Sequence, residues 1–180
     1  MGAEEPRSRT YAWADPHQWL AHAATLSGLE MLQRMAKGLI PPPPIAETLG
    51  MSSAEVEHGR FAVTVTPAEF HYNALGVVHG GVLAAILDTA AGCAVYSTLP
   101  VGMGCTSLDL HTRFFAAVRV TTGEIRCEGT VVHRGSRAAS ATARLEDRRG
   151  RLLAQASSTC LLMPAAGSSN PAGRGDTSAP

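Results

Sequence analysis

The feature that most constrains the fold is the apolar stretch of residues 80–97. It begins with two glycines, is rich in alanine and leucine, and is much longer than a typical strand. A single acidic residue, Asp88, interrupts it, and an alanine-rich run with a central charge is poorly suited to span a bilayer. We therefore predict one long buried helix over this stretch.

Segments on both sides of this stretch have strand character. Phe61, Val63 and Val65 alternate with polar residues until Pro67, which is the period of a strand exposed on one face. Four further segments follow the predicted helix, at residues 106–116, 123–133, 137–146 and 151–163. The last three of these segments are separated by short turn-like stretches, which implies that they run antiparallel to one another as a meander. This order predicts an α+β domain with the helix packed on one sheet.

Small side chains are common both in the predicted helix and in the predicted sheet. Ala139, Ala141 and Ala143 occupy alternate positions of the segment 137–146, and the helical stretch is studded with alanine. Small residues on both partners would let the sheet curl closely around the helix. An alanine-rich genome would give the same composition, so both explanations stay open.

The two ends of the chain differ from its middle. Residues 1–15 and 164–180 are polar or rich in small residues, and we predict that both are disordered tails. Between them we predict a helical segment with a proline connector at residues 16–44 and one domain at residues 45–163. The length of 180 residues leaves no room for a second catalytic domain.

The segment before the domain carries helix signals. Ser27 and Glu30 form a capping-box pattern, an apolar stripe follows, and Gly38 offers a stop. We predict an amphipathic helix here. The proline run at residues 41–44 ends it and predicts an extended connector into the domain.

Charge and cysteine usage exclude several classes of protein. The formal net charge is +0, so no global field holds the chain on nucleic acid or on an anionic membrane. The first residues lack the pattern of a secretory signal, which makes the cytoplasm the expected location. Cys93, Cys105, Cys127 and Cys160 lie scattered in apolar segments without zinc-ligand spacing, and we predict that they are reduced core residues.

Asp88 is the strongest candidate for a functional residue. Burying an unpaired carboxylate in an apolar helix costs several kcal/mol, so Asp88 must be paired or must face a wet cleft where it works. The structural alternative is an ion pair with an arginine of a neighbouring strand, such as Arg113.

The residues before the helix offer further polar groups. Gly80 and Gly81 leave unshielded N–H groups at the positive end of a helix dipole, where an oxyanion would be stabilised; a tight entry turn is the alternative. His79 beside them is expected to position the loop. Asn73 could hold a water or a carbonyl group, or could simply favour a turn.

The spacing of these groups bears on the oligomeric state. Eight residues separate Gly80 from Asp88, which is about 12 Å along one helix. One carbonyl carbon cannot touch both groups. If both act on the same carbonyl, the carboxylate must come from a second chain, so an enzyme of this kind is at least a dimer.

These residues resemble the signature of hotdog-fold acyl-CoA thioesterases of the phenylacetate-pathway, or PaaI-like, group. The family pattern N-x-x-G-x-x-H-G-G with a later acidic residue is filled here by Asn73, Gly76, His79, Gly80, Gly81 and Asp88. The resemblance covers residues 46–163 and implies a hotdog fold: an antiparallel sheet wrapped around a long central helix, here with an extra N-terminal amphipathic helix. One departure is the sequence at residues 114–118, which lacks the usual proline.

The resemblance implies roles for individual residues. Asp88 would be general base or nucleophile, and the Gly80 N–H, beside Gly81, would donate to the oxyanion. Asn73 and His79 would set the geometry of water and carbonyl. Ser107 would place a hydroxyl near the attacking water.

The resemblance also implies a substrate and an assembly. The phosphates of coenzyme A would lie near a late hairpin formed by Arg134, Gly135, Ser136 and Arg137; a solvated hairpin tip is the alternative. No metal or other cofactor is expected. The active sites would lie at the subunit interface of a homodimer or homotetramer.

Two other functions remain as alternatives. A hotdog hydratase or dehydratase would act on related thioesters, although the D-x-N-P-x-H pattern is absent. A non-catalytic acyl-CoA-binding protein would keep the fold without turnover. Within the thioesterase hypothesis, aromatic, short-chain and medium-chain acyl groups stay open.

Overall fold

The computed structural model describes residues 6–165, and its regular structure begins at His17. The helices are α1 (His17–Ala23), α2 (Gly28–Ala36), α3 (Pro44–Leu49) and α4 (Gly80–Tyr96), with short 3-10 turns η1 (Glu69–His71) and η2 (Val120–Thr122). The strands are β1 (Met51–Glu57), β2 (Arg60–Val65), β3 (Met103–Phe114), β4 (Ile125–Arg134), β5 (Ala138–Asp147) and β6 (Leu152–Pro164).

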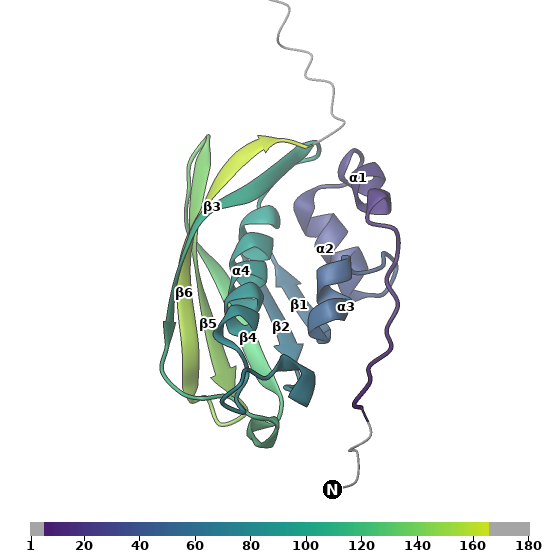
Figure 1. Cartoon of the computed structure of the whole chain (residues 1–180). Helices are drawn as coiled ribbons and strands as arrows, with labels where there is room; N and C mark the ends of the chain where they lie inside the picture. Colours follow the sequence, from purple (N-terminus) through teal and green to yellow (C-terminus); the bar gives the residue numbers. More distant parts are fainter. Residues whose placement is uncertain (1–5, 166–180) are drawn as a thin grey trace, which may run out of the picture.

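All six strands form one antiparallel sheet in the order β1-β2-β4-β5-β6-β3. The sheet curls around α4, which lies on its concave face, and α1 to α3 lie on the far side of α4 (Figure 1). Helix α4 contacts the five strands β2 to β6. The predicted α+β class and the hotdog arrangement are therefore confirmed. Within residues 6–165, no helix combines the length and apolarity needed to cross a bilayer.

Helix α4 and the sheet approach each other closely enough that side chains are excluded at one point. A Cβ atom added to Gly129 of β4 would lie 2.1 Å from the carbonyl oxygen of Ala90. On the next strand, Ala139, Ala141 and Ala143 are all buried beneath the helix. The alternating small residues thus serve close packing of helix on sheet.

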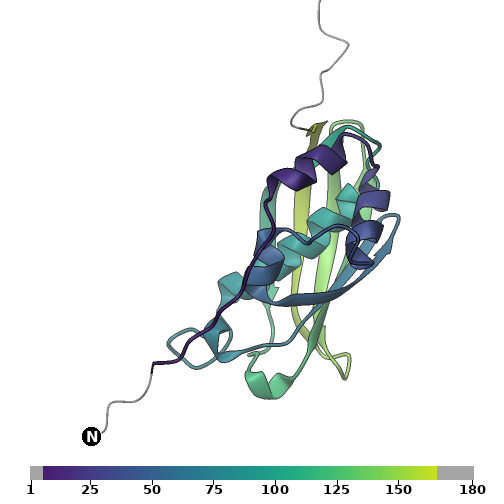
Figure 2. The same ribbon diagram turned by 90° about the vertical axis from the view of Figure 1, so that its right-hand side faces the viewer.

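The N-terminal helices pack on the C-terminal half of α4. The capping box of α2 is formed, because Ser27 Oγ accepts from the Glu30 N–H and the Glu30 carboxylate accepts from the Ser27 N–H. Next to it, Gly28 approaches the Tyr96 carbonyl too closely to carry a side chain. Met31 and Leu32 of α2 are completely buried. Figure 2 shows these helices in front of α4.

The proline run departs from the prediction. An extended connector was expected over residues 41–44, but Pro44 is the first residue of α3. Proline suits the first helical position because the N–H that it lacks would have no helical partner there. The strand β1 was not predicted either, because its alternation of half-buried and exposed residues covers only residues 54–57 and is interrupted by a register shift between Ser52 and Ala54.

The predicted tails lie mostly outside the described residues. Residues 1–5 and 166–180 are not described, and Pro164 is the last residue of β6. Residues 6–15 have no helix or strand, yet Arg9 donates hydrogen bonds to the carbonyl oxygens of Glu47 and Thr48 at the end of α3. Its guanidinium also lies 3.9 Å from the ring centre of Phe70. The domain boundaries proposed from the sequence stay predictions.

We expect Gly129→Ala to destabilise the protein by about 1–3 kcal/mol, because the added methyl group must push α4 off the sheet. Gly92→Ala is the matched control, since a Cβ atom on Gly92 of α4 would meet nothing within 4 Å. Alanine there should stabilise the helix by up to about 1 kcal/mol. Urea unfolding measures both, and a neutral Gly129→Ala would contradict the close packing.

Candidate active site

Asp88 sits in the middle of α4 and faces the edge strand β3. The Ser107 hydroxyl donates a 2.8 Å hydrogen bond to Asp88 Oδ1. Asp88 is half-buried and makes no ion pair among the described residues. Arg113, the predicted structural partner, is exposed and lines a separate hollow formed by β3, β5 and β6. The carboxylate is therefore held by a hydroxyl and not neutralised by a cation.

A bulge in β3 accompanies this contact. Ser107 pairs with Cys160 of β6 and Asp109 with Thr159, so Leu108 is an extra residue in β3. Asp109 Oδ1 accepts a hydrogen bond from the Thr159 N–H, which fixes the strand just beyond the bulge. Bulges redirect side chains and often lie next to functional sites. Here Ser107, and not its neighbour Thr106, reaches Asp88.

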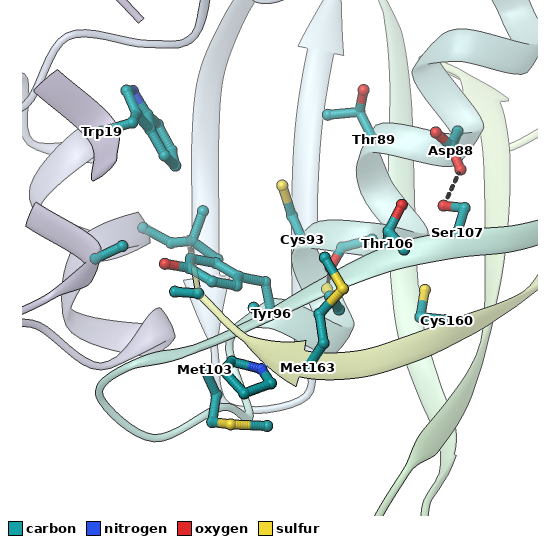
Figure 3. A pocket seen from close by; sticks show the side chains of 17 residues that line it. Trp19, Asp88, Thr89, Cys93, Tyr96, Met103, Thr106, Ser107, Cys160 and Met163 are labelled. Carbon is teal, nitrogen blue, oxygen red and sulfur yellow. Dashed lines mark hydrogen bonds between the residues drawn. The ribbon is translucent and has the colours of Figure 1, made fainter. Parts of the chain in front are cut away.

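Asp88 and Ser107 lie at one end of a cavity of about 420 Å³, which we call the Asp88 cavity. Figure 3 shows the two residues at one end and Trp19 at the other. The walls between them are apolar or sulfur-bearing and include Cys93, Tyr96, Met103 and Met163. A cavity of this size with a few convergent polar groups is typical of a small-molecule site.

Three cysteines line the Asp88 cavity as free thiols. Burial raises the pKa of Cys93 to about 12. Pairing with Cys160 raises the pKa of Cys105 and lowers that of Cys160. Cys93 and Cys105 are consequently neutral near pH 7 and act as apolar wall. The fourth cysteine, Cys127, is buried in the core, and residues 6–165 hold no group of three or more His, Cys, Asp or Glu side chains able to bind a metal ion.

The N-terminus of α4 forms a second polar feature. His79 is the N-cap, and its Nδ1 accepts a 2.8 Å hydrogen bond from the Gly81 N–H. The Gly81 N–H is thus occupied by His79 and is not available to a ligand. The Gly80 N–H has no hydrogen-bond acceptor within the described part of the chain, and it remains the donor that a ligand could engage. A methyl group added to Gly80 would lie 3.4 Å from the Phe114 ring at the end of β3.

Asn73 has a structural task in the loop before α4. Its Oδ1 accepts hydrogen bonds from the N–H groups of Leu75 at 2.9 Å and Val77 at 3.4 Å. Gly76 in the same loop has φ of +70°, which explains a glycine at that place in the motif. The side-chain oxygen of Asn73 therefore holds the loop, and only the side-chain amide nitrogen is left for a substrate or water.

The predicted site residues form three groups in one chain. Asp88 and Ser107 touch, while Gly80 lies about 12 Å from Asp88 along the same helix. The hairpin of residues 134–137 lies near the first group, because Ala138 pairs with Leu161, which also pairs with Thr106. This places the hairpin two strands, or about 10 Å, from the strand of Ser107. Arg134 and Arg137 are exposed there, whereas the Gly135 N–H donates to Ala138 O.

Sequence reasoning did not identify most of the cavity wall. Met103 and the N-terminal helices α1 and α2 line the Asp88 cavity, although none of them belongs to the sequence motif. The wall is assembled from α1, α2, α4, β3 and β6, so no local pattern reveals it. The one available signal was the large side chains Trp19 and Tyr96 at partly buried positions.

Comparison with known proteins shows which family this part of the chain resembles. Residues 75–154 match the family model of the thioesterase superfamily. A candidate esterase of Halobacterium salinarum is 32% identical over 93 residues, which are 49% of this chain and 60% of that protein. The chain therefore spans less than two thirds of the length of this relative. The segment that matches the family model contains Gly80, Asp88 and Ser107, and the match confirms the thioesterase resemblance.

Solved structures show the same fold. A candidate thioesterase of Ralstonia eutropha, described as related to phenylacetic acid degradation, is 29% identical with a TM-score of 0.65 over 72% of this chain and 97% of its own. The PaaI protein of the phenylacetic acid degradation operon of E. coli has a TM-score of 0.64 at 19% identity over 81% of this chain and 97% of its own. At that identity PaaI shows the fold alone.

We expect Asn73→Ala to lower the free energy of unfolding by about 1–2 kcal/mol, because the loop N–H groups lose their acceptor. Asn73→Asp keeps that acceptor and should leave stability nearly unchanged. Thermal unfolding of both variants checks this. A stability loss in Asn73→Asp as large as in Asn73→Ala would mean that the amide nitrogen, not the oxygen, holds the loop.

Proposed function

We propose that this chain, whose residues 75–154 match the thioesterase superfamily, hydrolyses acyl-CoA thioesters to the free acid and coenzyme A. The observation that carries the proposal is the Asp88 carboxylate, held by the Ser107 hydroxyl at the polar end of an apolar cavity. A thioester carbonyl placed there would meet a carboxylate at its carbon while its acyl group enters the cavity.

The chemistry needs a nucleophile and an oxyanion donor. Asp88 either removes a proton from a water that attacks the carbonyl carbon, or attacks that carbon itself to form a mixed anhydride that water then opens. In both routes a new C–O bond forms, the C–S bond breaks and coenzyme A leaves as a thiolate. The Gly80 N–H at the positive end of α4 stabilises the oxyanion.

One chain cannot bring these groups together, so the proposal requires a second copy. Ser107 beside Asp88 and Phe114 beside Gly80 lie on the same edge strand, β3. Antiparallel pairing of β3 with its copy, centred near Leu110 and His111, would bring the Asp88 end of one chain against the Gly80 end of the other. The exposed Leu108 and Phe114 would be covered by this pairing.

The nucleotide end of coenzyme A is assigned to the hairpin of residues 134–137. Arg134 and Arg137 are both exposed and make no ion pair within the described residues, so their guanidinium groups are available for phosphate. The Ser136 hydroxyl is also exposed there. The Gly135 N–H is not available, because it closes the hairpin.

We expect Asp88→Asn to lower kcat for acyl-CoA hydrolysis by about 10²–10⁴-fold with little loss of stability, because the amide keeps the shape but cannot act as a base. Thiol release from acyl-CoA substrates measures the rate. Glu57→Gln, a change of an exposed carboxylate on β1, which contributes no residue to the cavity, is the control. Equal activity of wild type and Asp88→Asn would refute the assignment.

The oxyanion donor can be removed without removing the helix. Gly80 is the first helical residue and His79 before it is extended, so Gly80→Pro deletes the N–H at a position where proline is tolerated. Its kcat should fall by about 10²–10³-fold, as expected for loss of one oxyanion donor. Gly80→Ala keeps the N–H and should retain most activity. Comparable losses in both variants would point to crowding against Phe114 instead.

Mixing the two inactive variants tests the shared site. A heterodimer of Asp88→Asn and Gly80→Pro chains contains one site with both wild-type groups, so random exchange should restore roughly a quarter of wild-type activity. The exchange is made by unfolding and refolding the mixture, with each variant refolded alone as the reference. A site built within a single chain would regain nothing on mixing.

A further inference from the structure

The Asp88 cavity ends at a residue that the hotdog domain does not supply. Trp19 belongs to α1, in the helical segment before the domain, and its ring faces the cavity opposite Asp88 (Figure 3). Its indole N–H donates a 3.0 Å hydrogen bond to the Pro41 carbonyl. Because Pro41 begins the proline run, the acceptor stands on a stiff stretch of backbone. The indole is therefore held in place as a wall.

A second hollow lies beyond this wall. It measures about 180 Å³ and is lined by Met35, Phe61 and Val63 together with Trp19 and Cys93. Trp19, Thr89 and Cys93 line both this hollow and the Asp88 cavity. Trp19 has by far the largest side chain of the three, so removing the indole would open space from the cavity toward this hollow, and Trp19 limits how far an apolar group can extend in that direction from Asp88.

The length of the Asp88 cavity can be judged from α4. Its wall follows one face of the helix from Asp88 through Gly92 and Cys93 to Tyr96, a distance of about 12 Å. An extended chain advances by roughly 3.3–3.6 Å for every three bonds, so about ten bonds fit in this length. The walls beyond the polar end offer no charged side chain to an acyl group.

Resting on the proposed thioesterase function, we propose that Trp19 sets the upper acyl length of the substrate, which is a straight-chain acyl thioester of about eight to ten carbons. Each methylene buried in the apolar cavity raises kcat/KM by about fourfold until the chain meets the indole. Longer chains then lose activity because they clash with a fixed ring. The residue that selects the substrate thus lies outside the segment that carries the chemistry.

The test is the hydrolysis of straight-chain acyl-CoA thioesters of four to sixteen carbons by wild type and by Trp19→Ala. Wild type should reach its highest kcat/KM at about eight to ten carbons. Trp19→Ala should shift the maximum to longer chains and raise kcat/KM for the fourteen-carbon substrate at least about tenfold. The four-carbon substrate, too short to reach the wall, should be turned over equally by both.

Trp13→Ala is the matched control, since Trp13 is 60% exposed and does not line the cavity. Its length profile should equal that of wild type. An unshifted profile in folded Trp19→Ala would overturn the inference while leaving the thioesterase proposal intact. Wild type that hydrolyses none of these substrates but releases thiol from an aryl-CoA would overturn the inference alone. Wild type that is inactive on both classes would overturn the thioesterase proposal, and the inference with it.

A binding measurement keeps the inference testable if Trp19→Ala does not fold. The chain has two tryptophans, so Trp13→Phe leaves Trp19 as the only indole. Non-hydrolysable S-alkyl-CoA thioethers of ten carbons should change the Trp19 emission, and those of four carbons should not. Binding of the ten-carbon thioether, seen as competitive inhibition, without any change in emission would overturn the inference.

Discussion

The close approach of α4 to the sheet at Gly129 is the constraint on which the rest of the structure depends. With no room for a Cβ atom there, β4 lies directly on the helix backbone at Ala90. A helix packed this closely against a sheet must present small or apolar side chains over most of its surface, as α4 does. A charge is tolerated only where the sheet does not seal the helix. Asp88 stands at such a place, facing the bulged edge strand.

The edge strand β3 links the two halves of the chemistry. It passes Asp88 at Ser107 and Gly80 at Phe114, and its outer edge has no strand partner within residues 6–165. An exposed edge with apolar side chains favours association with another strand. Pairing of two copies would cover the edge and complete the site with the same contact. In the proposed dimer, stability and catalysis therefore depend on one interface.

Elements with a strong periodic pattern and helix ends with capping residues could be predicted from the sequence. Surfaces formed by several elements together could not. The helix at residues 80–97 and the capping box at Ser27 follow from local rules, and both are present. β1 was missed because its alternation covers only residues 54–57, next to a register shift that the sequence of one strand does not reveal. The resemblance placed Ser107 near the site, but its contact with Asp88 depends on a bulge, which is set by pairing with β6 and is not visible in one strand's sequence.

The N-terminal helices show why chemistry and specificity separate in this chain. The groups proposed to act on the thioester come from one helix and one strand, whose positions are fixed by the close packing of α4 on the sheet. The far end of the Asp88 cavity depends instead on Trp19, held by a single hydrogen bond to the proline run. Changes in α1 or in that run can therefore move the wall without disturbing Asp88. In the proposed enzyme, acyl length could therefore change without a change in the motif, because the motif does not contain the residue proposed to limit it.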